Sequence, residues 1–152
     1  SPSSAASDVY KRQHRNKVET AVSIVHQATG IEAAASERRK QYDNRREAIR
    51  RLRLKLARKA RTRPRVDRYR PTELWQSRRQ GRTVSVNPRH RDYPGLLAEA
   101  LDVIVALEYD VARAAAALGV TISQLAKLLR HERHALATVN EGRVERGFPP
   151  LK

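Results

Sequence analysis

The chain has 152 residues, no cysteine, no methionine and a formal net charge of +16. The lack of cysteine excludes a disulfide framework, a thiol nucleophile and a cysteine-ligated metal site. So large an excess of positive charge favours a polyanionic partner, because each phosphate that a cation neutralises releases a bound counterion.

The positive charge is concentrated in the middle of the chain. Residues 36–70 contain 16 Lys and Arg against four Asp and Glu, whereas residues 96–152 contain seven of each kind. Acidic residues at ion-pair spacing are too few to balance the middle segment, which therefore favours nucleic acid as the partner. No apolar run approaches the length of about 18 residues that a membrane span needs, and no signal peptide is evident. We therefore expect a soluble cytoplasmic protein without a membrane partner.

The first residues of the chain have no regular pattern. Residues 1–13 are small and polar and lack periodicity, which predicts a disordered segment. The string is also similar to a translated sequencing-library adapter, so we expect it to be non-native and to lie outside the fold. A natural flexible tail is the alternative.

The first regular elements are predicted at residues 21–35. Residues 21–26 are β-branched and apolar and predict a strand. Residues 27–30 predict a turn, in which Gly30 is free to take a positive φ. Residues 31–35 predict a second strand, so this part of the chain predicts a β-hairpin.

A long basic helix is predicted after the hairpin. Ser36 is a suitable N-cap, and the helical pattern runs over about residues 43–61. Ile49, Leu52 and Leu56 are spaced to form one apolar stripe, while the other faces are almost entirely Arg and Lys. The pattern is that of an amphipathic helix with a basic outer surface.

The next segment, residues 62–93, is rich in arginine, is interrupted by prolines and shows no clear periodicity. Residues 72–75 could form a short helical turn. We expect the segment to be a basic linker that lies along RNA and becomes ordered on binding. For Tyr69 and Trp75, stacking on bases and packing against the following helices are equally good interpretations.

The character of the sequence changes at Pro94. Apolar positions over residues 96–107 form a strong helical stripe. Gly119 ends a second helix, and Thr121 can cap a third. These patterns predict a compact helical bundle over residues 94–152. Its later helices are predicted at residues 111–118, 122–130 and 134–146.

Two of these helices have the outline of a helix-turn-helix. The segment 111–125 contains a tight turn at Gly119, and Ser123, Gln124 and Lys127 lie on the face that would read DNA. The neutral charge of the bundle argues against independent DNA binding, which needs a basic surface. A packing or ribosome-docking module is the preferred interpretation.

No metal or cofactor site is predicted. His90, His131 and His134 lack the converging ligands that zinc requires, and surface histidines are the preferred interpretation. No Ser-His-Asp arrangement and no phosphate-binding glycine loop is visible in the sequence. We therefore expect no metal and no small-molecule cofactor.

The most specific pattern in the chain spans residues 13–56. Its first block, Gln13-His14-Arg15-Asn16-Lys17-Val18-Glu19-Thr20-Ala21-Val22, resembles the sequence that follows the Gly-Gly-Gln loop of class I peptide release factors. The similarity covers about 45 residues without gaps and ends in the helix at residues 48–56. Between these ends it continues through His26, Thr29, Gly30, Glu37, Arg39, Gln41, Asn44, Arg45 and Arg46.

The resemblance implies hydrolysis of peptidyl-tRNA. In that family the loop enters the peptidyl-transferase centre, its glutamine helps to place a water, and its backbone N–H stabilises charge on the ester. The two glycines permit a close backbone approach. Here Lys11 and Arg12 stand where the glycines belong, and Gln13 is in register with the catalytic glutamine. We interpret the missing glycines as a lost beginning of the chain.

The whole sequence predicts an α+β fold in four parts. These are a disordered segment at residues 1–13, a release-factor-type hairpin and helix at 14–61, a basic linker at 62–93 and a helix-turn-helix-like bundle at 94–152. The resemblance implies a bacterial, monomeric protein that binds the ribosome through ribosomal RNA and peptidyl-tRNA.

The predicted function is translation release or ribosome rescue by codon-independent hydrolysis of peptidyl-tRNA, with this chain impaired by the missing glycines. The alternatives are a non-catalytic ribosome- or RNA-binding protein and, less favoured, a helix-turn-helix DNA-binding regulator. Gln13 is the candidate catalytic residue. The residues expected to bind RNA are His14, Arg15, Asn16, Lys17, Arg38, Arg39, Lys40, Gln41, Asn44, Arg45, Arg46, Arg50, Arg51 and Arg53.

Overall fold

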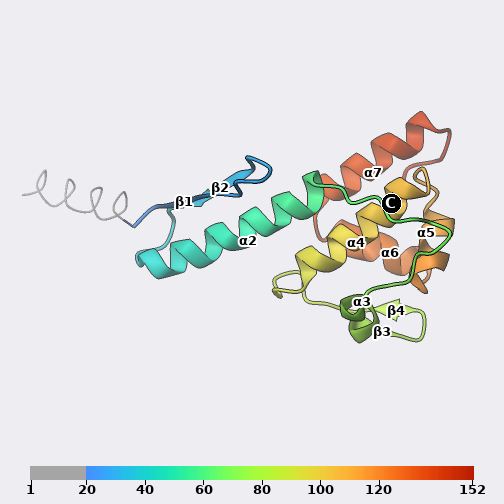
Figure 1. Cartoon of the computed structure of the whole chain (residues 1–152), viewed down its shortest axis with the longest axis horizontal. Helices are drawn as coiled ribbons and strands as arrows, with labels where there is room; N and C mark the ends of the chain where they lie inside the picture. The colour runs from blue at the N-terminus through green and yellow to red at the C-terminus, as the bar shows by residue number, and fades with distance from the viewer. Residues whose placement is uncertain (1–19) are drawn as a thin grey trace, which may run out of the picture. The chain divides into compact units, whose positions relative to one another are not determined.

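The computed structural model describes residues 20–152, which form two short antiparallel hairpins and a set of helices (Figure 1). The predicted α+β class is confirmed. The chain divides into two compact units after Leu56, which we call unit 1 and unit 2. Each unit is described by itself below.

Unit 1 contains the predicted hairpin. Strand β1 (Val22–Val25) pairs antiparallel with β2 (Glu32–Ala35), and Val22 lies opposite Ala35. The turn is closed by the His26 N–H, which donates to the Ile31 carbonyl at 2.8 Å. Gly30 has φ +73°, a conformation that favours glycine, as the sequence predicted.

The long helix of unit 1, α2 (Gln41–Lys59), follows the hairpin. It begins two residues before the predicted start, and Ser36 is not its cap because residues 36–40 lie between strand and helix. Ala33 and Ala35 of β2 and Ala48 of α2 are all buried. The buried positions of β2 and several buried positions of α2 are thus occupied by small side chains.

The predicted apolar stripe of α2 is only partly buried, because Leu52 and Leu56 are half-buried whereas Ile49 is exposed. Ile49 is 40 % exposed, whereas Asn44 and Ala48 are fully buried. Arg51 and Lys55, about one and two turns beyond Ala48, contact the hairpin through the Ala34 and Glu32 carbonyls. Ala48 rather than Ile49 therefore lies on the buried side of the helix.

Unit 2 contains the four predicted helices at nearly the predicted bounds. They are α4 (Tyr93–Ala106), α5 (Val111–Leu118), α6 (Ile122–Arg130) and α7 (Arg133–Glu145). Helix α4 packs against the other three (Figure 1). The core between them is closely filled by buried aliphatic side chains, among them Leu96, Leu97, Ile104, Leu118, Leu125 and Leu129.

Helices α5 and α6 are joined by the predicted tight turn. Gly119 has φ +73°, and the Val120 N–H donates to the Ala115 carbonyl at 3.0 Å, which closes the end of α5. The Thr121 hydroxyl accepts a hydrogen bond from the Gln124 N–H at 3.1 Å and caps α6. Both predicted cap residues are thus confirmed, and the pair has the form of a helix-turn-helix.

Residues 62–93, which belong to unit 2, were expected to be irregular but contain regular elements. It contains α3 (Glu73–Arg78) and a second hairpin formed by β3 (Arg79–Gln80) and β4 (Thr83–Val84). Trp75 is fully buried, and its indole N–H donates to the Leu118 carbonyl at 2.7 Å. Packing is therefore the correct interpretation of Trp75. The helical turn suggested at residues 72–75 is the start of α3.

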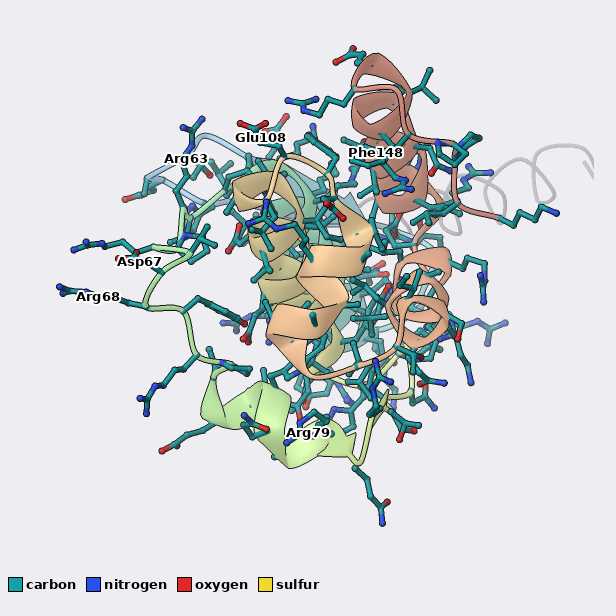
Figure 2. All side chains as sticks on the ribbon, turned by 90° about the vertical axis from the view of Figure 1, so that its right-hand side faces the viewer. Arg63, Asp67, Arg68, Arg79, Glu108 and Phe148 are labelled. Atoms are coloured by element: carbon teal, nitrogen blue, oxygen red, sulfur yellow. The ribbon has the colours of Figure 1, made fainter. Side chains whose placement is uncertain are left out.

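Two carboxylates of α4 attach residues 61–72 to the bundle. Glu99 accepts hydrogen bonds from the Tyr69 hydroxyl, the Thr72 hydroxyl and the Thr72 N–H, the last at 2.9 Å. Asp102 pairs with Arg61 at 2.8 Å. Burial and the contact with Glu99 raise the pKa of the Tyr69 phenol. The segment is thus anchored in unit 2, while Arg63, Asp67 and Arg68 are exposed (Figure 2).

Candidate nucleic-acid interface

The first five predicted site residues lie outside the described part of the chain. These are Gln13, His14, Arg15, Asn16 and Lys17, and the description begins at Thr20. The remaining ten all belong to the loop before α2 or to α2 itself, so the structure brings them together in unit 1.

Most of these residues present their side chains to solvent. Arg38, Arg39, Lys40, Gln41, Arg45 and Arg46 are exposed, and Arg53 is half-buried. Within residues 20–152, none of the side chains of Arg39, Lys40 and Arg45 has an ion pair. A row of unpaired cations in the loop and the first turns of α2 can contact phosphates directly.

Two arginines that are predicted to bind RNA make ion pairs within unit 1. Arg50 pairs with Glu47 at 2.7 Å. Arg51 pairs with Glu37 at 2.9 Å and donates to the Ala34 carbonyl at 2.8 Å. The hydrogen bond from Arg51 is the main cause that lowers the pKa of the Glu37 carboxyl. Arg51 thus attaches α2 to the hairpin, as does Lys55 through the Glu32 carbonyl at 2.8 Å.

Asn44 is buried and bonded to the backbone of unit 1. Its side chain is fully buried, and its amide group donates to the Thr20 carbonyl at 2.8 Å and to the Arg38 carbonyl at 3.0 Å. Its amide oxygen accepts from the Arg38 N–H at 2.9 Å. Two of the three bonds hold the backbone of Arg38, in the loop that also carries Arg39 and Lys40, and the third holds the backbone of Thr20 before β1. Asn44 therefore fixes the backbone of the basic loop at Arg38, and its side chain has no exposed surface that could contact RNA.

Sequence reasoning missed an exposed aromatic residue at the start of α2. Tyr42 is 67 % exposed, and the Arg46 guanidinium lies 5.8 Å from the centre of its ring. Ile49 follows on the same side of the helix at i+7 and is also exposed. An exposed aromatic ring among arginines is a platform on which a base can stack. Tyr42 lies on the side of α2 away from the buried Asn44 and Ala48. Assigning those two residues to the inner face would have predicted that Tyr42 is exposed.

The histidines of unit 2 form no metal site among the described residues. No group of three or more His, Asp and Glu in residues 20–152 is placed to hold a metal ion. His90 lies instead beside Arg78 and Asp92, which form an ion pair at 2.8 Å. Arg78 is the main cause that lowers the pKa of the Asp92 carboxyl. None of the helices formed by residues 20–152 is long and apolar enough to cross a membrane.

The comparison with known proteins gives one match. A family model described as RF-1 domain matches residues 5–93 of the chain. No curated protein and no solved structure matched. The matched residues include the whole of β1, β2 and α2, together with α3 and the second hairpin. Most of α4 and all of α5, α6 and α7 lie beyond them.

Proposed function

The chain belongs to the RF-1 domain family of class I release-factor-like proteins, and from that premise we propose that it docks on ribosomal RNA and acts in ribosome rescue. The observation that carries the proposal is the agreement between the family match and the basic loop and helix of unit 1. Arg39, Lys40 and Arg45 are exposed there and have no acidic partner among residues 20–152. Cations in such a setting favour phosphate contacts.

The proposal includes binding that does not depend on a codon. Contacts to phosphate groups carry no sequence information, so docking through them recognises the shape and charge of RNA. Tyr42 adds a stacking surface, which accepts any base because every base has a π-face. We propose that Asn44 and Arg51 hold the loop and helix in the shape that presents these groups. They are thus positioning residues, whereas the sequence had assigned them to RNA binding.

The catalytic step is proposed to be weak in this chain. The resemblance to release factors implies that a Gly-Gly-Gln loop places water and stabilises charge on the peptidyl-tRNA ester. Lys11 and Arg12 precede Gln13 here, and side chains at these positions restrict the close backbone approach that glycine permits. Gln13 remains the candidate catalytic residue.

A peptide-release assay on stalled ribosomes tests this step. The double variant Lys11→Gly with Arg12→Gly should release nascent peptide about 10²-fold faster than the parent chain, the usual effect of restoring one oxyanion-binding group. The Gln13→Ala variant of that glycine-restored chain is the control and should return to the slow rate. Equal release by parent and double variant, at the rate of an active factor, would contradict the proposal.

A binding-only role is the second candidate function, and Lys11 and Arg12 are the observation that favours it. If this role is correct, the double glycine variant binds ribosomes as the parent does yet still releases no peptide. The same assay therefore separates the two functions, provided that ribosome binding is measured in parallel.

A further inference from the structure

The second hairpin brings positive charge to the helix-turn-helix of unit 2. The Thr121 N–H donates to the Arg82 carbonyl at 3.1 Å, and the Val84 N–H lies 3.4 Å from the Gln124 amide oxygen that accepts it. The β3–β4 hairpin is thus fixed beside the first turn of α6. The bundle alone is neutral, but the surface at α6 includes this hairpin.

The turn of the helix-turn-helix is covered by an arginine. A Cβ at Gly119 would lie 3.3 Å from the Arg79 Cδ, so the Arg79 side chain runs across the turn. It is held there by the Gln76 side chain, which accepts from the Arg79 Nε at 3.0 Å. Figure 2 shows Arg79 at this end of unit 2, below α5.

No acidic residue lies within the two segments that form this surface. Residues 79–91 and 119–131 contain six Lys and Arg and no Asp or Glu. The acidic residues that flank the two segments are already engaged. Asp92 pairs with Arg78 at 2.8 Å, and Glu132 accepts from the His134 N–H at 3.1 Å. The field at this surface therefore favours an anionic partner.

A groove lies between β4 and α6. It has a volume of about 270 Å³. Among its lining residues, Ser85, Lys127 and His131 supply hydroxyl, ammonium and imidazole groups that can donate to phosphate oxygens. Lys127, which lines the groove, and Arg82, which precedes the lining residue Thr83, are both exposed. The groove thus combines charge with hydrogen-bond donors suited to a nucleic-acid backbone.

We infer that the β3–β4 hairpin and α6 form a second nucleic-acid-binding surface, which docks on the backbone of double-helical RNA. The inference rests on the proposed function, because a chain held on the ribosome by unit 1 presents unit 2 to RNA at high effective concentration. We call this surface, with Arg79, Arg82 and Lys127 as its cations, the α6 surface.

The side chains of α6 favour a backbone contact over base reading. Gln124, which could read adenine in a DNA groove, is turned toward the hairpin. Arg130, which could read guanine, donates to the Lys152 carbonyl at 2.8 Å. The exposed side chains nearest the turn are Ile122 and Ser123, which make few specific base contacts. A sequence-reading DNA partner is therefore disfavoured.

The test measures binding of the full chain to an RNA duplex of about 20 base pairs, a length that spans the footprint of a duplex-RNA-binding domain. The test variant is Arg82→Glu with Lys127→Glu, because both side chains are exposed and neither makes a hydrogen bond or ion pair with a described residue. The control variant is Arg68→Glu with Arg113→Glu, which changes the net charge equally and lies at exposed positions of the same unit. The fluorescence of Trp75 verifies that each variant is folded.

The test variant should bind the RNA duplex about tenfold more weakly or worse, and the slope of log K against log salt should fall by about 2, one for each lost phosphate contact. The control should change affinity far less. Equal affinities of parent and test variant, or equal losses in test and control, would overturn the inference. Tighter binding to a DNA duplex of the same sequence would overturn it in favour of a DNA partner.

The inference and the proposed function can fail separately. Reversal of charge on α2, at Arg45 and Arg46, tests docking of unit 1 on ribosomes and leaves the α6 surface intact. If that variant binds ribosomes normally while the α6 variant loses RNA-duplex binding, the proposed docking fails and the α6 surface stands. The opposite pair of results removes the α6 surface alone.

Discussion

At the residue scale, the polar side chains of unit 1 divide into those that face solvent and those that hold the fold. Asn44 and Arg45 are neighbours in a basic stretch, yet one is fully buried and the other is exposed. The burial of Asn44 is tolerated because its amide group makes three hydrogen bonds to backbone groups. A residue of this kind determines the shape of the basic loop.

The Asn44→Ala variant should lower the free energy of unfolding of unit 1 by about 1–3 kcal/mol, because it removes three hydrogen bonds to part-buried backbone groups and leaves the Arg38 N–H and the Thr20 carbonyl without the Asn44 amide. Amide hydrogen exchange at Arg38, whose N–H donates to Asn44, measures the loss directly. Arg45→Ala is the control and should change stability by less than about 0.5 kcal/mol. Unchanged protection of Arg38 in the Asn44 variant would show that the bond is not structural.

The ion pair of Asp92 with Arg78 predicts a pH effect. The hydrogen bond from Arg78 holds the pKa of the Asp92 carboxyl below its ordinary value of 3.8. A carboxyl with a lowered folded-state pKa stabilises the fold above its unfolded-state value and loses that contribution as the pH falls through the folded-state value. Asp92→Asn should therefore flatten the loss of stability below about pH 4, measured as denaturation midpoint against pH. Asp67→Asn, at an exposed site, should keep the parent's profile.

At the element scale, the structure assigns the arginine-rich segment to the fold of unit 2. Helix α3 inserts Trp75 under Leu118 at the end of α5, and β4 buries Val84 beside α6. The hairpin thereby positions Arg79 and Arg82 at the helix-turn-helix. Residues 62–93, which the sequence predicted to be a linker, thus contribute to both the core and the charged surface of unit 2.

Trp75 is the single tryptophan of the chain and reports on this packing. Its emission should be blue-shifted and protected from iodide, and addition of RNA should not quench it, because the ring is fully buried. Trp75→Ala should cost about 3–5 kcal/mol of stability in unit 2, whereas Glu73→Gln on the same helix should cost under about 0.5 kcal/mol. Strong quenching by RNA would indicate that the ring stacks on bases instead.

The elements that could be predicted from the sequence are those in which an apolar pattern continues over several helical turns and ends at a capping residue. Helices α4 to α7 have apolar stripes, and Gly119 and Thr121 mark the turn between α5 and α6. The β3–β4 hairpin could not be predicted, because each strand has two residues and no alternation can be read from two. It is stabilised by contacts with α6, which are far away in the sequence.

The candidate site could be predicted in its location but only partly in its residues. The density of arginine identified the loop and α2 correctly as the basic region. Composition cannot distinguish Arg45, which is exposed, from Arg51, which is bonded to Ala34 and Glu37. The exposure of Tyr42 was not predicted, because Ile49 on the same side of α2 was expected to be buried. The structure buries Ala48 and exposes both Tyr42 and Ile49.

At the scale of the whole molecule, two units carry positive charge on surfaces of different form. Unit 1 presents an exposed loop and helix with Tyr42 as a stacking surface, and unit 2 presents the α6 surface beside a groove. Two weak contacts on one chain bind a large RNA more tightly than either alone, because the second contact forms within the complex. Ribosomal RNA offers many phosphate positions to such a chain.

The central claim is that unit 1 docks on the ribosome through its exposed cations. Binding of the full chain to bacterial ribosomes, measured by co-sedimentation over a range of salt concentrations, tests it directly. The Arg45→Glu, Arg46→Glu variant should bind about tenfold more weakly or worse and should lower the salt slope by about 2, whereas Arg68→Glu with Arg113→Glu should bind nearly as the parent does. Parent-like ribosome binding by the Arg45, Arg46 variant, or an equal loss in both variants, would contradict the claim.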